Sequence, residues 1–250
     1  MTTNEKIKQL KDMITDSKNI VFFGGAGVST ESGIPDFRSS DGIFEAIKEF
    51  GLQPEYILSH SFYKDDPENF FKFVFKFMVY PDVKPNVTHK VLAKLEEDGK
   101  LKAIVTQNID GLHQAAGSKN VYELHGSFAR SYCQDCNKLY SFEEFTDPKR
   151  KHEGSNIPRC DCGGILKPDI ILYEELLDEK IIYNSIEAIK KADMLIIGGT
   201  SLNVYPAAEL TWDFMGKYLV LINKDETPSD SRANLVIHDN LGNVFQELMQ

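Results

Sequence analysis

The rest of the chain is organised around one glycine-rich segment, Gly24-Gly25-Ala26-Gly27-Val28-Ser29-Thr30-Glu31-Ser32-Gly33-Ile34-Pro35-Asp36-Phe37-Arg38. It follows a β-branched and aromatic run, Ile20-Val21-Phe22-Phe23, which is typical of a buried parallel strand. Glycines directly after such a strand let the backbone turn tightly and come close to a ligand. A helix that starts at about Val28 would point its free N–H groups toward this turn and form an anion site. An ordinary strand–turn–helix joint is the alternative, because Thr30 stands where the usual dinucleotide fingerprint has its third glycine.

The composition is that of a globular chain with a sizeable core. The 250 residues are 42% hydrophobic and 26% charged, which suits one large domain or one domain with a small insertion. The net charge of −10 argues against general nucleic-acid binding and suits a lysine-rich partner. No apolar run approaches ~18 residues, and the polar stretch Met1 to Asn19 has no signal-peptide core. We therefore expect a cytoplasmic protein that binds neither membrane nor nucleic acid.

Hydrophobic strands and amphipathic helices alternate along most of the chain. After the first strand, further strands are expected at Leu101 to Thr106, Val121 to Leu124, Asp193 to Gly198 and Tyr218 to Ile222. Helical patterns precede and separate them, such as the one with Ile181, Ile182, Ile186 and Ile189 on one face. This alternation predicts a parallel α/β sheet.

Polar motifs follow several of these strands at the point where each strand ends. In an open α/β sheet, ligands lie beyond the carboxyl ends of the strands, so these motifs should share one edge with the glycine loop. The motifs are Gln107-Asn108-Ile109-Asp110-Gly111-Leu112-His113, His125-Gly126-Ser127, Gly199-Thr200-Ser201-Leu202 and Asn223.

The four cysteines lie in two close pairs between the two halves of the alternating pattern. Cys133-x-x-Cys136 is followed, after 23 residues, by Cys160-x-Cys162. Four thiolates at this spacing suit tetrahedral zinc, which can hold together a module too small to have its own core. Four reduced thiols or a redox pair are the alternatives. Because all four ligands would be cysteines, the site should be closed and structural.

The segment of residues 39–86 differs from its flanks. It holds no convincing strand, and five phenylalanines lie between Asp65 and Tyr80. This density suits either a helical core or the wall of an apolar pocket.

The motifs above, taken in order, resemble those of the sirtuins, which are NAD-dependent protein-lysine deacylases. The resemblance runs from about Ile20 to Asn223 and includes the four cysteines. It implies a Rossmann-like parallel sheet with helices on both faces, plus a small domain made of a zinc ribbon and a helical insert. The Rossmann-like domain would comprise residues 1–38, 87–127 and 169–250. The helical insert would comprise residues 39–86, and the zinc-binding module residues 128–168.

The resemblance also implies the chemistry. Nicotinamide leaves NAD as the acyl oxygen of the substrate attacks the ribose, and a base then activates a ribose hydroxyl. His125 matches that base, and a histidine can accept a proton near neutral pH. His113 would brace the adjoining loop.

By the same matching, a set of residues would contact NAD, and a smaller set the acyl-lysine peptide. The expected NAD contacts are Ala26, Gly27, Thr30, Phe37, Arg38, Gln107, Asn108, Ile109, Asp110, His125, Thr200, Ser201, Asn223, Lys224 and Asn240. The expected substrate contacts are Ile171, Tyr173 and Val204.

Two departures from the family pattern, and one comparison with a subset of its members, bear on function. The pair Cys160-x-Cys162 is one residue tighter than usual. The segment Tyr173-Glu174-Glu175 replaces Phe-Gly-Glu and puts a side chain where glycine lets a peptide lie close. Relatives that prefer acidic acyl chains carry a Tyr-x-x-Arg pair, which aligns here with Phe73 and Lys76. Together with an apolar wall that includes Phe71, this predicts acetyl and other neutral acyl groups.

Two other functions remain open from the sequence. One is mono-ADP-ribosyl transfer, which shares the first step but uses another acceptor. The other is non-catalytic binding of NAD or ADP-ribose. A dehydrogenase is disfavoured, because the third glycine and the ribose-binding acid are missing.

Overall fold

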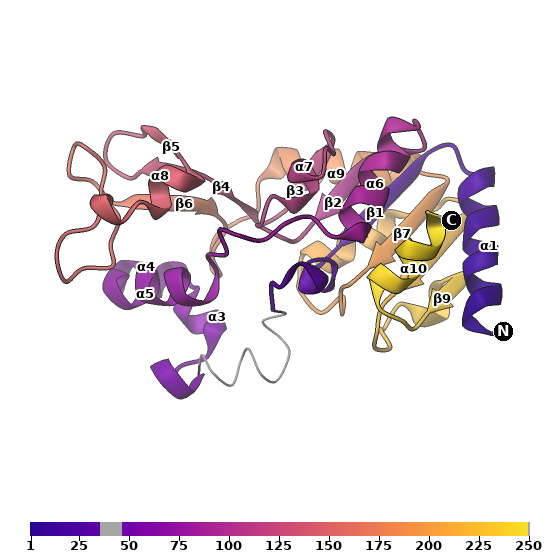
Figure 1. Cartoon of the computed structure of the whole chain (residues 1–250), viewed down its shortest axis with the longest axis horizontal. Helices are drawn as coiled ribbons and strands as arrows, with labels where there is room; N and C mark the ends of the chain where they lie inside the picture. Colours follow the sequence, from indigo (N-terminus) through magenta and orange to yellow (C-terminus); the bar gives the residue numbers. More distant parts are fainter. Residues whose placement is uncertain (36–46, 250) are drawn as a thin grey trace.

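The computed structural model describes residues 1–35 and 47–249, and it forms two lobes (Figure 1). Phe37 and Arg38 lie outside the described residues. The large lobe contains a six-stranded sheet and both ends of the described chain. The small lobe contains a three-stranded sheet and a group of short helices. No helix within the described ranges is long and apolar enough to cross a membrane.

The sheet of the large lobe is parallel throughout, as the alternating pattern predicts. Its strand order is β3-β2-β1-β7-β8-β9. The strands are β1 (Ile20–Gly24), β2 (Leu101–Thr106), β3 (Val121–Glu123), β7 (Met194–Gly198), β8 (Tyr218–Ile222) and β9 (Leu235–Ile237). Five of the six were predicted. Strand β9 was not predicted: it is as short as β3, but its three apolar residues lie between polar ones and no recognised motif follows them.

Helices cover both faces of this sheet. They are α1 (Thr3–Asp16), α6 (Val87–Glu97), α7 (Leu112–Ala115), α9 (Glu179–Lys191) and α10 (Leu241–Leu248), with the 3₁₀ turns η4 (Ala207–Asp213) and η5 (Asp230–Arg232). Phe22 and Ile196 face a cluster that includes α1, α6 and α10, whereas Val21 and Ile197 face a cluster that includes α9. Alternate residues of one strand therefore enter two separate apolar layers, which confirms the expected Rossmann-like arrangement.

The glycine-rich loop after β1 does not continue into a helix. It forms two 3₁₀ turns, η1 (Ala26–Val28) and η2 (Thr30–Ser32). Gly33 then takes a left-handed conformation (φ 93°) that ends the second turn. The expectation of a helix from Val28 was wrong: hydroxyl side chains favour turns over helix interiors, and the second turn stops at this glycine. The anion site expected from a helix dipole is therefore absent from this described loop.

The small lobe packs two distant parts of the chain into one core. Strands β4 (Gly126–Cys133), β5 (Leu139–Ser141) and β6 (Leu166–Ile170) form an antiparallel sheet in the order β5-β4-β6. Its helices are α3 (Pro54–Ile57), α4 (His60–Asp65), α5 (Pro67–Phe77) and α8 (Phe142–Thr146), with the 3₁₀ turn η3 (Pro148–Arg150). Phe70, Phe71 and Phe73 of α5 are fully buried in the same cluster as Tyr140 and Phe145. The aromatic stretch is thus helical core, the first of the two alternatives.

Candidate active site and metal centre

A cavity of about 390 Å³ lies beyond the carboxyl ends of β1, β2 and β7, where the two lobes meet. This is the edge of an α/β sheet at which ligands bind. The residues that line the cavity come from both lobes. They are Ala26, Leu58, Met78, Gln107, Asn108, Ile109, His125, Ile170, Ile171, Leu172, Tyr173, Glu174, Glu175, Leu176, Leu177, Gly199, Thr200, Ser201, Val204, Tyr205 and Pro206.

His125 lies in this cavity, in the joint between the lobes. It lies between β3 and β4, with only Leu124 separating it from β3, and its carbonyl oxygen accepts the N–H of Ile171 at 2.9 Å. Its Nδ1 lies 2.9 Å from the carbonyl oxygen of Gln107. Because a carbonyl can only accept, Nδ1 carries the proton in the neutral ring, and Nε2 is the nitrogen that can accept one. The backbone thus sets the tautomer that a general base requires.

Ser29 connects the glycine-rich loop with the motif after β2. Its fully buried hydroxyl donates to Asp110 Oδ2 at 2.6 Å and accepts from Asn108 Nδ2 at 3.1 Å. The other oxygen of Asp110 accepts the N–H of Leu112 at 2.9 Å. Burial raises the pKa of Asp110, although these hydrogen bonds oppose the shift. Asn108, which lines the cavity, and Asp110, which does not, are therefore held in fixed positions.

Two glycines of the loop allow the backbone after β1 to touch the backbone after β7. The N–H of Gly27 donates to the carbonyl oxygen of Gly199 at 2.8 Å, and a Cβ on Gly27 would lie 2.8 Å from the Gly199 Cα. A Cβ on Gly25 would lie 2.7 Å from the Cβ of Thr200. The immediate need for glycine at both positions is loop-to-loop packing.

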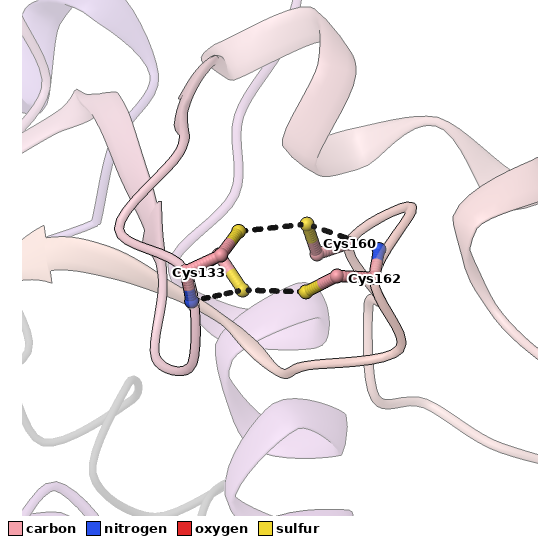
Figure 2. A group of neighbouring side chains, drawn as sticks. Cys133, Cys160 and Cys162 are labelled. Atoms are coloured by element: carbon pink, nitrogen blue, oxygen red, sulfur yellow. Dashed lines mark hydrogen bonds between the residues drawn. The ribbon is translucent and has the colours of Figure 1, made fainter.

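The four cysteines converge at one end of the small lobe. Figure 2 shows Cys133, Cys160 and Cys162 pointing toward one another, and all four Sγ atoms, with that of Cys136, lie within 4.8 Å of one another. The Sγ–Sγ separations are 3.5 Å for Cys133–Cys162 and 3.6 Å for Cys136–Cys160. Zinc bonded at ~2.3 Å to four tetrahedral sulfurs would separate them by roughly 3.8 Å. The cluster therefore fits one closed, structural zinc ion.

The tight Cys160-x-Cys162 pair closes through a glycine turn. Gly163 is left-handed (φ 94°), and its N–H donates to the carbonyl oxygen of Cys160 at 2.9 Å. A Cβ on Gly164 would lie 2.7 Å from the Cys133 Sγ. The shorter spacing still brings both thiols to the cluster, because these two glycines let the turn pass close to it.

Comparisons with known proteins agree with this geometry. The model of the Sir2 family matches residues 25–206, which include the glycine-rich loop, the candidate base and the four cysteines. The chain belongs to the Sir2 family.

Relatives of this sirtuin match it over almost its full length. An "NAD-dependent protein deacetylase" of Clostridium acetobutylicum is 56% identical and covers 98% of both chains. One of Clostridium perfringens is 58% identical, over 98% of this chain and 99% of the relative. A solved Sir2 with a p53 peptide and NAD⁺ has a TM-score of 0.85 at 37% identity, with 97% of each chain covered. Another, bound to an acetylated peptide, has a TM-score of 0.83 at 36% identity and the same coverage.

The cavity of this sirtuin gathers most of the residues predicted from the sequence, but not all of them. Those that line it are Ala26, Gln107, Asn108, Ile109, His125, Ile171, Tyr173, Thr200, Ser201 and Val204. Thr30 is exposed in η2, and its hydroxyl bonds back to the Gly27 carbonyl oxygen. Asn223, Lys224 and Asn240 lie farther along the same edge, after β8 and before α10.

Several residues of the site were missed. Ser29 was part of the quoted motif but was given no role, although its hydroxyl holds both Asn108 and Asp110. Leu58 and Met78 reach the cavity from the helical insert. Nothing in the local sequence pattern distinguishes these two from other apolar residues of the insert.

The segment with Tyr173, Glu174 and Glu175 is joined to the helical insert. The N–H of Tyr173 donates to the carbonyl oxygen of Leu58 at 3.0 Å. Glu174 is left-handed (φ 75°), the conformation that glycine adopts easily, and its carboxylate accepts the N–H and hydroxyl of Ser61 at 2.9 and 2.6 Å. The side chain of Glu174, which stands where the family pattern has glycine, is thus directed toward α4.

The predicted apolar wall was wrong at Phe71, and neither position aligned with the Tyr-x-x-Arg pair lines the cavity. Phe71 and Phe73 are fully buried in the small-lobe core, and the ammonium group of Lys76 pairs with Glu49. Among the described residues of the insert, those that line the cavity are Leu58 and Met78.

Proposed function

We propose that this sirtuin is an NAD-dependent protein-lysine deacetylase. It transfers the acetyl group of a lysine to ADP-ribose and releases nicotinamide. The observation that carries this proposal is the position of His125: its Nδ1 is fixed by the Gln107 carbonyl, and its ring lines the cavity beside Asn108. Relatives named as NAD-dependent protein deacetylases align with 97–98% of this chain, which supports the same activity.

The described residues fit NAD as the cosubstrate. NAD supplies the ADP-ribose that receives the acyl group. Gln107 and Asn108 face the reacting ribose, and Ile109 and Asp110 hold the carboxamide of nicotinamide. The buried, acceptor-rich Asp110 beside Ser29 suits an amide partner.

The remaining cofactor residues extend along the edge of the sheet. Ala26, Gly27 and Thr30 approach the phosphates and a ribose. Thr200, Ser201 and Asn223 bind the adenosine end, with Lys224 and Asn240 as neighbours. Phe37, expected over the nicotinamide ribose, and Arg38, expected to contact a phosphate or order the loop, lie outside the described residues.

His125 acts as the general base. With Nδ1 donating to a carbonyl, Nε2 would accept a proton from a ribose hydroxyl when NAD is bound. That hydroxyl would then attack the acyl carbon, the lysine amine would leave with a proton, and one water would be consumed in forming the ester. The acyl-lysine enters between Ile171, Tyr173 and Val204, all of which line the cavity. The zinc ion, held by four thiolates, keeps the small lobe folded and takes no part in the chemistry.

We also infer that the chain divides into two domains with the boundaries expected from the sequence. The Rossmann-like domain comprises residues 1–38, 87–127 and 169–250, and the small domain comprises residues 39–86 and 128–168. The two separate sheets support this division, with β4 and β6 crossing its boundary beside His125. We also place the protein in the cytoplasm, where acetylated proteins and NAD are both present.

Mass spectrometry of the products tests the proposal directly. With NAD and an acetyl-lysine peptide, we expect equal amounts of nicotinamide, free peptide and an acetyl ester of ADP-ribose. ADP-ribose attached to protein, with the acetyl-lysine unchanged, would indicate mono-ADP-ribosyl transfer instead. Binding of NAD with no new product would indicate a non-catalytic protein.

A further inference from the structure

One contact joins residues that are 211 positions apart, at the edge of the sheet that carries the cavity. The N–H of Gly242, in the first turn of α10, donates to Glu31 Oε1 at 3.0 Å. Glu31 belongs to η2, the second turn of the glycine-rich loop. The carboxylate therefore comes from a loop and bonds to the start of a helix formed by the end of the chain.

Glu31 does the work that a capping residue normally does. The N-cap of α10 is Asn240, a favoured residue there, but its side chain makes no capping hydrogen bond. The first N–H groups of a helix lack partners within the helix, and a negative charge near them is favourable. A carboxylate from the loop satisfies one of these groups.

Gly242 leaves the space that this contact needs. A Cβ at that position would lie 1.6 Å from Glu31 Oε2, and the three atoms nearest to it all belong to Glu31. Glycine is otherwise a poor residue inside a helix. An alanine here would displace the flexible end of the Glu31 side chain and little else.

The contact lies directly behind the cavity. Leu241, the first residue of α10, packs on Gly198 and Gly199, where added Cβ atoms would lie within 2.8 Å of its methyl groups. Gly199 lines the cavity and accepts the N–H of Gly27. The loop that carries Ala26, Gly27 and Thr30 is thus held between the end of β7 and the start of α10.

We infer that Glu31 is a positioning residue for NAD: its carboxylate ties the glycine-rich loop to α10 and holds the loop in its cofactor-binding conformation. This inference rests on the proposed function, because it assigns the loop to NAD. It predicts a role in NAD affinity and none in the acetyl-transfer step or in peptide binding.

The test compares Glu31→Ala, Glu31→Gln, Gly242→Ala and the double variant Glu31→Ala/Gly242→Ala. Glu31→Ala and Gly242→Ala should each raise the NAD dissociation constant and KM about threefold to tenfold. In both, kcat and the KM for acetyl-peptide should stay within about twofold of wild type. Glu31→Gln keeps an oxygen that can accept from Gly242, so its NAD affinity should stay within about twofold of wild type.

Gly242→Ala separates positioning from general stability. Alanine is the better helix former, so this variant should unfold no sooner than wild type while binding NAD more weakly. The double variant should be no worse than either single variant, because both break the same contact. Glu5→Ala, which removes a carboxylate from the start of α1, is the matched control and should bind NAD normally.

Calorimetric titration measures NAD affinity without requiring acetyl transfer, so it tests the inference independently of the proposed function. A wild type that binds NAD but transfers no acetyl group would overturn the proposed function, and the same titrations would still decide the role of Glu31. Wild-type NAD affinity in both single alanine variants would overturn the inference. The inference would also be overturned if the increases in the NAD dissociation constant of the two single variants multiplied in the double variant.

Discussion

The two lobes are held together in different ways. In the large lobe, alternate residues of the long parallel strands enter two apolar layers, and Phe22 and Phe23 are fully buried on opposite faces of β1. In the small lobe, a single core combines α5 of the helical insert with the strands around the cysteines. The regular hydrophobic periodicity of its strands and helices is sufficient to form the core of the large lobe. The core of the small lobe depends on contacts between distant segments and on four thiols. The active site lies between them, because β4 leaves directly from His125 and the residue after β6 bonds back to it.

The largest expected effect comes from the thiol cluster. Cys136→Ser removes one of four ligands, so zinc affinity falls and the small lobe unfolds. We expect complete loss of deacetylation and loss of zinc by elemental analysis. Hydrogen exchange should show unprotected amides in β4, β5 and β6, while β1 and β7 remain protected.

Gln134→Ala is the matched control, since it alters an exposed residue of the same turn that offers no thiol. It should retain zinc and activity. A Cys136→Ser protein that is zinc-free, folded and active would show that the metal is unnecessary. The small lobe would then, like the large lobe, fold without a metal.

A smaller effect is expected from acid, and it concerns the large lobe. His89 and His113 are fully buried there with ring centroids 4.7 Å apart, and burial lowers their pKa values to about 4 and about 3. Unfolded histidines bind protons below about pH 6.5, whereas the folded rings resist protonation. Stability is therefore fully present above that pH and is lost as the pH falls from about 6.5 toward 4 and 3.

Urea unfolding at pH 7 and pH 5 measures this loss. Each buried histidine should contribute about 2 kcal/mol to the difference between the two pH values. His113→Leu should therefore reduce that difference by about 2 kcal/mol, while His152→Leu, at an exposed position, should leave it unchanged. An equal reduction in both variants would mean that burial is not the cause.

The smallest effect concerns the acyl group. The residues that line the described cavity include Glu174 and Glu175 but no lysine or arginine, so a carboxylate on the acyl chain would meet no cation there. Burying an unpaired carboxylate is costly, and we expect kcat/KM for acetyl-lysine to exceed that for succinyl-lysine about tenfold or more.

Competition between acetyl, succinyl and butyryl versions of one peptide tests this preference. Butyryl is nearly as long as succinyl but uncharged, so it separates the effect of charge from that of size. A higher kcat/KM for succinyl would mean that a cation reaches the cavity and that the account of its wall is wrong.

The large lobe was predicted almost completely because its signals are local. Strands β1, β2, β7 and β8 are mostly buried apolar runs, and they end, like β3, near polar motifs that the topology brings to one edge. The predictions fail where the conformation of a segment depends on a contact with a distant part of the chain. The loop after β1 forms 3₁₀ turns because its backbone is used to pack on Gly199, which the sequence of the loop does not reveal.

The small lobe was predicted less well because its contacts are not local. A helix with phenylalanines at Phe70, Phe71, Phe73 and Phe77 has an apolar face, but the sequence does not say whether a core or a ligand covers it. The structure places that face against Tyr140 and Phe145. The cysteine cluster was predicted because its spacing reflects the geometry of the metal itself.

The central claim is that His125, fixed between the two lobes, is the base for acyl transfer to NAD-derived ribose. The most direct test measures NAD binding and product formation for His125→Ala beside wild type. The account predicts NAD affinity within about threefold of wild type, but formation of the acetyl ester reduced roughly 10²- to 10⁴-fold, because the base acts after binding. Near-normal turnover in His125→Ala would contradict the claim.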